Sequence, residues 1–368
     1  MRPFPGKAAL QQRVLPTYRV PFFETLAQHC EGGLSVCAGQ PRPKETITTT
    51  DQVAIADFHS IHNLHFLGGS LYVCWQRGLA AWLARENPTA LIVEANPRYL
   101  STQTAINWMR AKNRPVIGWG LGAPPLRGPL AILRQSRRVR FLSQLDAIIA
   151  YSNRGAQQYR QLGLRPDQIF VAPNAVAPPP NSPPSVRASI PAAQATVLFV
   201  GRMQARKRLG DLLEACAGLP QNIQPKLLIV GDGSARDAFE QIAQNIYPQA
   251  QFLGARHGDE LTAIFRKADL FVLPGTGGLA VQEAMSHGLP VIVAEGDGTQ
   301  NDLVRPGNGW LVHPGNVIAL RRALQHALDD LPQLRRMGQE SYRIVKEEIN
   351  IQTMAETFVA VLLRVTSL

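Results

Sequence analysis

Short continuous hydrophobic runs alternate with amphipathic segments through the second half of the chain. The continuous runs predict β-strands at 196–201, 226–231, 250–254, 270–275, 290–294 and 309–312. Between them, apolar positions recur with the period of an α-helix at 208–219, 234–244, 259–268, 278–287 and 316–328. Strands that are apolar on both faces are typical of parallel sheets covered by helices on each side. The pattern therefore predicts an α/β fold with a doubly wound sheet.

The first half shows the same alternation less cleanly. It predicts strands at 34–39, 90–95, 115–120 and 146–152, and helices at 21–30, 77–87 and 154–163. A segment rich in proline, serine and alanine, 179–193, has no periodicity and reads as a linker. We therefore expect two doubly wound domains, 1–178 and 194–348, facing across a cleft. The amphipathic end of the chain, 349–368, is predicted to be a helix that packs back on the first domain.

Composition narrows the class of protein. The chain has 368 residues, 45% of them hydrophobic, which is enough for two cores. No apolar run approaches the length of a membrane span, and the first residues lack the apolar segment of a signal peptide. Four scattered cysteines, Cys30, Cys37, Cys74 and Cys216, show no paired spacing. These features predict a cytoplasmic protein with reduced thiols.

The net charge of +11 resides entirely in the first half. Residues 1–175 hold 20 Lys and Arg against 9 Asp and Glu, whereas 176–368 hold 18 of each. Segment 95–145 contains nine basic residues and no acid. Such a field attracts an anionic membrane, a nucleic acid or a phosphorylated substrate. The alternative is a solvated surface in a protein that prefers arginine, since 31 of its 38 basic residues are Arg.

Part of this basic segment, 128–145, predicts a helix that opens after Pro129. Leu130, Leu133, Arg137 and Phe141 follow one another at helical spacing, and the remaining arginines, Arg134, Arg138 and Arg140, lie beside them. An apolar stripe flanked by arginines can dock on an anionic leaflet. Alternatively, Leu130, Leu133 and Leu142 pack into the first domain.

Glycines follow three predicted strands of the second half. Gly277 and Gly278 precede a helix that begins near Leu279 and carries Glu283. Gly201 is followed by Arg202 and Lys207, and Gly231 and Gly233 form the third turn. Each turn alone is a weak signal. Together they place cations, glycine-rich backbone and helix N-termini at one edge of a parallel sheet, as needed to hold a diphosphate. Glu283 is then suited to accept hydrogen bonds from ribose hydroxyls.

Other chemistries fit less well. The dinucleotide pattern G-x-G-x-x-G fails at Arg236, and Gln251 stands where an acid would bind ribose. His59, His62 and His65 are spaced by three, which does not place two imidazoles on one helix face. There is no Asp-x-Asp pair, serine elbow or Cys–His pair. We therefore expect no bound metal and no cofactor, and the nucleotide would be a substrate.

The motifs resemble the retaining nucleotide-sugar glycosyltransferases of the GT-B fold, known as group 1 or family four, which have two Rossmann-like domains. The second half carries the resemblance best, in "VGRMQARKRLGDLLEA", "LLIVGDGSARDAFE" and "GLAVQEAMSHGLPVIVA". The first half adds "RVLPTYRVPFFETL" and "NPRYLSTQTAINWMRAKNRPVIGWGLG", which are similar to acceptor domains of enzymes for bacterial surface sugars.

The resemblance implies roles for residues of this chain. Arg202 and Lys207 would neutralise the donor diphosphate as catalytic groups, and Glu283 would bind ribose. The backbone of the other donor-side positions would contact phosphate, sugar or base: Gly201, Gly231, Gly233, Arg256, Gly277, Gly278 and Leu279. Acceptor-side candidates are Tyr18, Arg19, Trp119, Gly120 and Gly122. The chain departs from the family at Gly275, where a glutamate is usual, and at Leu121, where a histidine is frequent.

The resulting functional prediction is a metal-independent glycosyltransferase of surface polysaccharide synthesis. It would move a sugar from a UDP- or GDP-linked donor, with retention, to a glycan or polyprenyl-phosphate-linked acceptor at the inner face of the membrane. Nucleic acid is not expected as a partner. The two departures keep open a non-catalytic relative that binds sugar nucleotide or anionic membrane. A sugar-nucleotide epimerase on the same fold is a further alternative.

Overall fold

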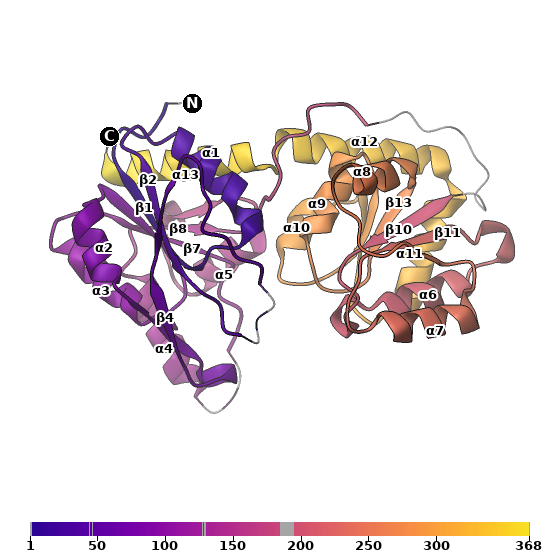
Figure 1. Cartoon of the computed structure of the whole chain (residues 1–368), viewed down its shortest axis with the longest axis horizontal. Coiled ribbons are helices and arrows are strands. Elements are labelled where there is room, and N and C mark those ends of the chain that lie inside the picture. Colours follow the sequence, from indigo (N-terminus) through magenta and orange to yellow (C-terminus); the bar gives the residue numbers. More distant parts are fainter. Residues whose placement is uncertain are drawn as a thin grey trace. The chain divides into compact units, whose positions relative to one another are not determined.

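The structure is a computed structural model that describes residues 2–43, 45, 47–126, 128, 130–184 and 195–367. The chain divides into two units (Figure 1). Unit 1 comprises Met1–Pro178 and Ile351–Leu368, and unit 2 comprises Pro179–Asn350. Most of the predicted linker, 185–193, lies outside the described residues.

Unit 1 is built on a seven-stranded parallel sheet in the order β3-β2-β1-β6-β7-β8-β9. Its strands are β1 Ala8–Val14, β2 Leu34–Gly39, β3 Asp57–Ser60, β6 Ala90–Glu94, β7 Val116–Gly120, β8 Ala147–Ala150 and β9 Ile169–Val171. An antiparallel hairpin, β4 His62–Phe66 with β5 Val73–Arg77, stands beside the sheet. Ligands of such sheets bind beyond the carboxyl ends of the strands.

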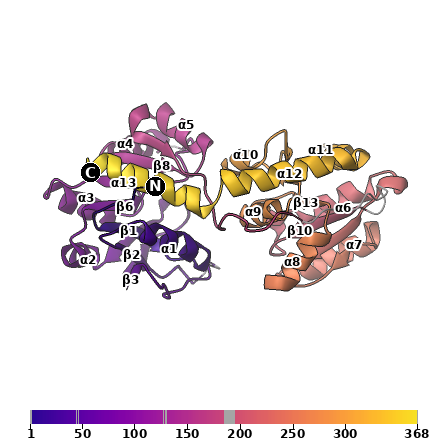
Figure 2. The same ribbon diagram turned by 90° about the horizontal axis from the view of Figure 1, so that it is seen from above.

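Helices cover both faces of this sheet (Figure 2). Residues of α2 Leu79–Glu86, α3 Ser101–Arg110, α4 Ala131–Leu142 and α5 Asn153–Gln161 share one hydrophobic core with the strands. On the other face, α13 Ile351–Thr366 packs on α1 Val20–Gln28, and the rings of Phe22 and Phe358 lie 5.0 Å apart. The last helix of the chain therefore completes the first unit.

Unit 2 has a six-stranded parallel sheet in the order β12-β11-β10-β13-β14-β15. Its strands are β10 Thr196–Val200, β11 Lys226–Val230, β12 Gln251–Phe252, β13 Leu270–Leu273, β14 Val291–Ala294 and β15 Gly309–Val312. Its helices are α6 Leu209–Ala217, α7 Arg236–Ile246, α8 Gly258–Lys267, α9 Leu279–Ser286, α10 Thr299–Leu303, α11 Val317–Asp329 and α12 Leu331–Glu347. The α/β class with parallel sheets predicted from the hydrophobic pattern is confirmed.

The hydrophobic pattern does not predict strand β1, because two glutamines interrupt the apolar sequence of this strand. Gln11 and Gln12 are buried in this inner strand, which lies between β2 and β6 in the unit 1 sheet. The amide of Gln11 donates to Oε1 of Gln76 at 2.6 Å and to Oγ1 of Thr102 at 3.1 Å. These hydrogen bonds offset the cost of burying the amide. The polar sequence of β1 therefore fits an inner strand because Gln11 has hydrogen-bond partners 65 and 91 residues away.

Candidate functional sites

In unit 2, Gly231 and Gly233 let the chain pass close to another loop. Both have positive φ, +134° and +155°. A Cβ on Gly231 would collide with the carbonyl oxygen of Gly201, and a Cβ on Gly233 would lie 2.9 Å from the nitrogen of Met203. Hydrogen bonds from Gly201 N to Val230 O and from Met203 N to Asp232 O join the same two loops. In this structure these two glycines shape the loop of Arg202 by backbone packing.

The side chain of Lys207 reaches from the loop after β10 to the beginning of α9. It ends a 3₁₀ turn, Ala205–Lys207. Its Cε would lie 3.7 Å from a Cβ on Gly201, and its ammonium fills the space where a side chain on Gly277 would stand. Burial lowers the pKa of Lys207, and the positive charges of Arg206 and Arg202 lower it further. Among the described residues, no carboxylate pairs with this half-buried ammonium. The site is therefore electropositive and suited to an anion.

The N-terminus of α9 faces the same place. Gly278 caps the helix with no side-chain hydrogen bond, so the first amides of the helix remain available. The carbonyl of Gly277 accepts from Nε2 of Gln300 at 3.3 Å, which orients this turn. A helix N-terminus beside a lysine is a favourable environment for phosphate.

Gly275 stands against the backbone that carries Lys207. A Cβ at this position would lie 2.5 Å from C and 2.6 Å from Cα of Lys207. Thr276 N donates to the carbonyl of Arg206 at 3.1 Å and holds the two segments together. The glutamate that the resemblance leads one to expect here does not fit this arrangement. The glycine is required by the close approach of the two loops.

Glu283 lies further along α9 and is partly buried. Burial raises the pKa of this carboxyl, and the nearby His257 opposes the rise. His257 follows Arg256, whose guanidinium is 3.7 Å from Glu260. The structure thus brings the Arg256 loop and Glu283 together at the same edge of the sheet. Leu279 is exposed in the first turn of α9.

Unit 1 contains a separate pocket of about 630 Å³ at the carboxyl ends of β6 and β7. The ends of β6, β7 and β8, the start of β5 and one side of α4 line it. Three of the acceptor-side candidates lie here: Trp119, Gly120 and Gly122. Trp119 is buried, and its Nε1 has no hydrogen-bond partner among the described residues. The ring centre of Trp119 lies 5.5 Å from that of Phe22 and 5.2 Å from that of Phe358, so this donor is buried among aromatic side chains and is not exposed to a ligand.

Tyr18 and Arg19 do not line this pocket. Arg19 is buried, donates to Oδ1 of Asn174 at 2.5 Å, and lies 5.0 Å from the ring centre of Trp119. The arginine therefore packs on the ring of Trp119 and does not line the pocket itself. Tyr18 is partly exposed in the same 3₁₀ turn.

The sequence interpretation missed Glu94, the carboxylate of this pocket. It ends β6 and pairs in register with Trp119 of β7. Burial raises its pKa, against the hydrogen bond that Arg13 N donates to Oε1 at 2.5 Å. The signal was present, because Glu94 is the polar residue at the carboxyl end of a predicted parallel strand, where ligands bind.

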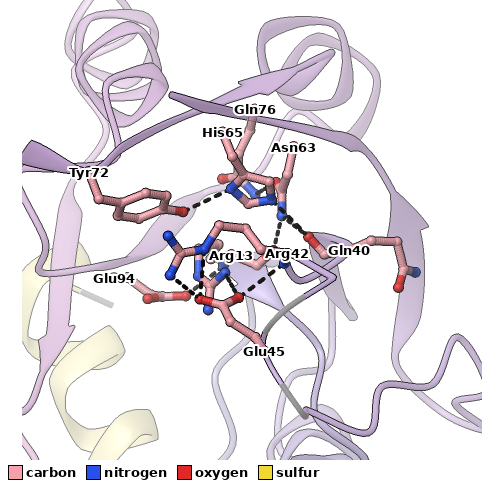
Figure 3. Close-up of polar contacts among 9 residues, drawn as sticks. All are labelled: Arg13, Gln40, Arg42, Glu45, Asn63, His65, Tyr72, Gln76 and Glu94. Carbon is pink, nitrogen blue, oxygen red and sulfur yellow. Dashed lines mark hydrogen bonds and ion pairs between the residues drawn. The ribbon is translucent and has the colours of Figure 1, made fainter. Parts of the chain in front are cut away.

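A polar network fixes the β4–β5 hairpin that forms one wall of the pocket (Figure 3). Arg13 and Arg42 donate to the carboxylate of Glu45 at 2.7 and 2.8 Å. Burial raises the pKa of Glu45, but these hydrogen bonds outweigh it and bring the value to about 2. The guanidinium of Arg42 lies 4.4 Å from the ring centre of Tyr72, whose hydroxyl is 2.9 Å from Nδ1 of His65. Tyr72 lines the pocket, so the network holds this wall in place.

Helix α4 forms the opposite wall. Its C-terminal residues Phe141 and Leu142 are buried in the core of unit 1, whereas Leu130 just before the helix and Leu133 are 54% and 58% exposed. Both of these leucines line the pocket. The alternative in which Leu130, Leu133 and Leu142 pack into the first domain is therefore wrong for Leu130 and Leu133 and is confirmed for Leu142. Ile132, on another side of the helix, is 86% exposed.

The described residues contain neither a cluster suited to a metal ion nor a helix suited to span a membrane. Among the described residues, no group of three or more His, Cys, Asp or Glu side chains could hold a metal ion. Within the same ranges, no helix has the length and hydropathy required to cross a membrane.

Two units built on parallel sheets, together with the likeness to solved structures, place the chain in the class of GT-B folds. HepE from Anabaena, solved in complex with UDP, aligns over 98% of this chain and 100% of its own with a TM-score of 0.72 and 16% identity. Sucrose-phosphate synthase from Thermosynechococcus elongatus aligns over 98% and 99% with a TM-score of 0.70 and 20% identity. At these identities the likeness shows the fold.

The family is indicated by sequence. Residues 186–344 match the model of the family "Glycosyl transferases group 1", so unit 2 carries a domain of this family. A GDP-mannose-dependent alpha-mannosyltransferase of Mycobacterium tuberculosis is 37% identical over 127 residues, 34% of this chain and 31% of that protein. An uncharacterized glycosyltransferase of Methanocaldococcus jannaschii is 28% identical over 174 residues, 43% of this chain and 45% of that protein. The chain thus matches less than half the length of these relatives.

Proposed function

We propose that this chain is a glycosyltransferase that moves a sugar from a nucleoside-diphosphate sugar to a hydroxyl of an acceptor. The observation that carries the proposal is Lys207. Its half-buried ammonium lies beside Gly277 at the start of α9, near Arg202 and Arg206, and has no carboxylate partner among the described residues. A diphosphate supplies the negative charge that the Lys207 ammonium lacks.

The chemistry follows from where charge develops. As the bond between the sugar and the diphosphate breaks, negative charge grows on the leaving phosphate. In this proposal, Arg202, Lys207 and the first amides of α9 stabilise that charge. With retention, the acceptor hydroxyl attacks from the face that the diphosphate leaves, and the leaving phosphate can accept the hydroxyl proton. These cationic groups perform the charge stabilisation for which a divalent ion is otherwise used, so we propose transfer without a metal.

Two observations bear on the donor. Glu283 is positioned on α9 beside the loop of Arg256, which suits a carboxylate that binds ribose and a backbone that faces the base. HepE was solved with UDP and with UDP-glucose, and several relatives are named for GDP-mannose. We therefore propose a UDP- or GDP-linked donor. The acceptor in this proposal is a glycan or a polyprenyl-phosphate-linked sugar of surface polysaccharide synthesis, reached at the cytoplasmic face of the membrane.

A direct test uses the purified chain with UDP-glucose, GDP-mannose and the related sugar nucleotides. Ligands that bind the native state raise its apparent stability, so a thermal-shift screen identifies the donor. The donor is then labelled in its sugar, and label transfer and donor hydrolysis are measured with and without a chelator. Binding without transfer or hydrolysis would favour a non-catalytic binder. Epimerisation of the donor without an acceptor would favour the epimerase. If none of the nucleotides binds, the proposal is refuted.

A further inference from the structure

Residues of three chemical kinds line the pocket of unit 1: polar, positively charged and apolar. Glu94 and Trp119 stand at its inner end, where β6 and β7 finish. Arg98, Arg134 and Arg138 contribute positive charge, and Leu71, Leu130 and Leu133 contribute apolar surface. A ligand that satisfies all three needs a hydroxyl or other polar group, an anion and a hydrocarbon chain in one molecule. The pocket volume, about 630 Å³, is in the range of sites that enclose a molecule of drug size.

The arginines form a cluster of like charge. Arg98, Arg134 and Arg138 all line this one pocket. Burial lowers the pKa of Arg138, and the positive charges of Arg134 and Arg98 lower it further. Arg138 donates one hydrogen bond, to the carbonyl of Pro124 at 2.7 Å. Among the residues that the structure describes, no carboxylate forms an ion pair with these three arginines. Like charges held together without a counter-ion favour binding of an anion, and arginine prefers phosphate.

The polar, positively charged and apolar residues also follow one another from the inner end of the pocket to its open end. Arg98 comes four residues after Glu94, so the anion site adjoins the polar inner end. Along α4, Arg138 lies one turn from the buried Leu142, Arg134 one turn further, and Leu130 one turn beyond that. The exposed fractions of Leu130 and Leu133 exceed one half, so the apolar end is also the open end. A ligand in this pocket would present sugar, phosphate and chain in that sequence from the inside out.

We propose that this pocket binds a lipid-linked sugar phosphate, with its phosphate between Arg98, Arg134 and Arg138 and its hydrocarbon chain along Leu71, Leu130 and Leu133. The first sugar would then lie toward the inner end of the pocket, where the carboxylate of Glu94 would accept a hydrogen bond from one of its hydroxyls. This inference rests on the proposed function for the identity of the ligand as an acceptor. It adds the location and residues of the phosphate subsite and assigns the charge of α4 to substrate recognition.

The test measures binding by calorimetry and requires no transfer activity. The probe is farnesyl diphosphate below its aggregation concentration, compared with farnesol and with inorganic pyrophosphate. The wild-type chain should bind farnesyl diphosphate at least tenfold more tightly than either partial probe. The double variant Arg134→Gln, Arg138→Gln should lose at least tenfold in affinity for farnesyl diphosphate. Arg140→Gln is the matched control, because Arg140 is exposed on the same helix and does not line the pocket.

The apolar wall has its own variant. Leu133→Gln should weaken farnesyl diphosphate and leave inorganic pyrophosphate unchanged, whereas Ile132→Gln should alter neither, since Ile132 lies outside the pocket. Equal binding by the double variant and by Arg140→Gln would overturn the inference. Binding to vesicles of phosphatidylglycerol without binding of farnesyl diphosphate would also overturn it, and would assign the arginines to membrane phospholipid.

Donor binding in unit 2 separates this inference from the proposed function. UDP and GDP are titrated into the same variants, all of which should bind nucleotide like the wild-type chain. If farnesyl diphosphate binds and no nucleotide does, the proposed transfer fails while the phosphate subsite stands. If nucleotide binds and farnesyl diphosphate does not, the subsite fails while the donor site stands.

Discussion

The ammonium of Lys207 occupies the position that a side chain on Gly277 would need. Lys207 follows β10 and Gly277 follows β13, and these strands are neighbours in the sheet of unit 2. Residues 70 positions apart are therefore adjacent, and the cation lies at the start of α9. The absent side chain at Gly277 is what allows the contact, since any Cβ there would displace the ammonium.

Lys207→Ala and Arg202→Ala should each reduce transfer by about two decades, because a charge-assisted contact that strengthens in the transition state contributes about 3 kcal/mol. Both variants should remain folded, as circular dichroism and thermal unfolding can show. Lys267→Ala, an exposed cation at the end of α8, serves as the control with unchanged kcat/KM. Wild-type turnover in both site variants would exclude the assigned phosphate site.

Gly275→Ala should weaken binding of UDP or GDP by at least tenfold, about 1.4 kcal/mol. A Cβ here meets the backbone of Lys207 at 2.5–2.6 Å, so the segment that carries the ammonium must shift. Restoring the usual glutamate should be at least as harmful, whatever it does to sugar preference. Gly210→Ala is the matched control, because its nearest neighbour would be a carbon of Phe239 at 4.0 Å. Unaltered nucleotide affinity in Gly275→Ala would contradict this geometry.

Glu283→Gln should weaken bare UDP or GDP by about tenfold, or about 1.4 kcal/mol, if the carboxylate binds ribose. Burial raises the pKa of Glu283 above its usual 4.5, so the free energy of unfolding falls as the pH rises from 4.5 through the raised pKa. The variant should therefore be no less stable than the wild-type chain at pH 7. Calorimetric titration and chemical denaturation measure the two effects separately. A loss of stability equal to the loss of affinity would point to a purely structural role.

Ile132→Glu should reduce binding to anionic vesicles, because Ile132 is an exposed apolar side chain on a helix rich in arginine. Reversal of Arg134, Arg137 and Arg138 to Glu should abolish it, since each cation near an anionic surface contributes about 1 kcal/mol. Co-sedimentation at low and high salt is the measurement, and salt should weaken the wild-type interaction. If wild-type protein stays in the supernatant at low salt, α4 is no membrane contact.

Glu45→Gln should lower the thermal midpoint at pH 7 and remove part of the acid sensitivity of unit 1. Because the pKa of Glu45 falls from 4.5 to about 2, its contribution to stability is complete above pH 4.5 and is lost as the pH drops toward 2. Glu31→Gln, an exposed carboxylate in the same unit, is the control. Identical acid unfolding of wild type and Glu45→Gln would show that the network in Figure 3 does not stabilise the hairpin.

Several features of this protein were predictable from local sequence. In unit 2, every strand except β12 is a continuous apolar run, and the helices between the strands keep their period, so the alternation that defines the parallel sheet is visible without any partner. The order of Gly201, Lys207 and Gly277 along the chain was sufficient to predict that they come together. The carboxyl ends of parallel strands lie at one edge of the sheet, and loops that follow them converge there.

The tertiary structure alone decided the features that depend on distant partners. Gln11 looks like a surface residue until Gln76 and Thr102 satisfy its side chain, and only the backbone carbonyl of the buried Gln12 accepts from Gln76. The inner strand β1 therefore has no hydrophobic signature. Gly275 is a departure from a motif in sequence, but in the structure it is the contact point of two loops. Likewise, Glu94, Arg98 and Arg138 are separated by up to 44 positions and form one pocket only because β6 and α4 pack on the same core. Hydrophobic periodicity reports which face of an element is buried, whereas burial of polar groups and clustering of charge depend on which elements become neighbours.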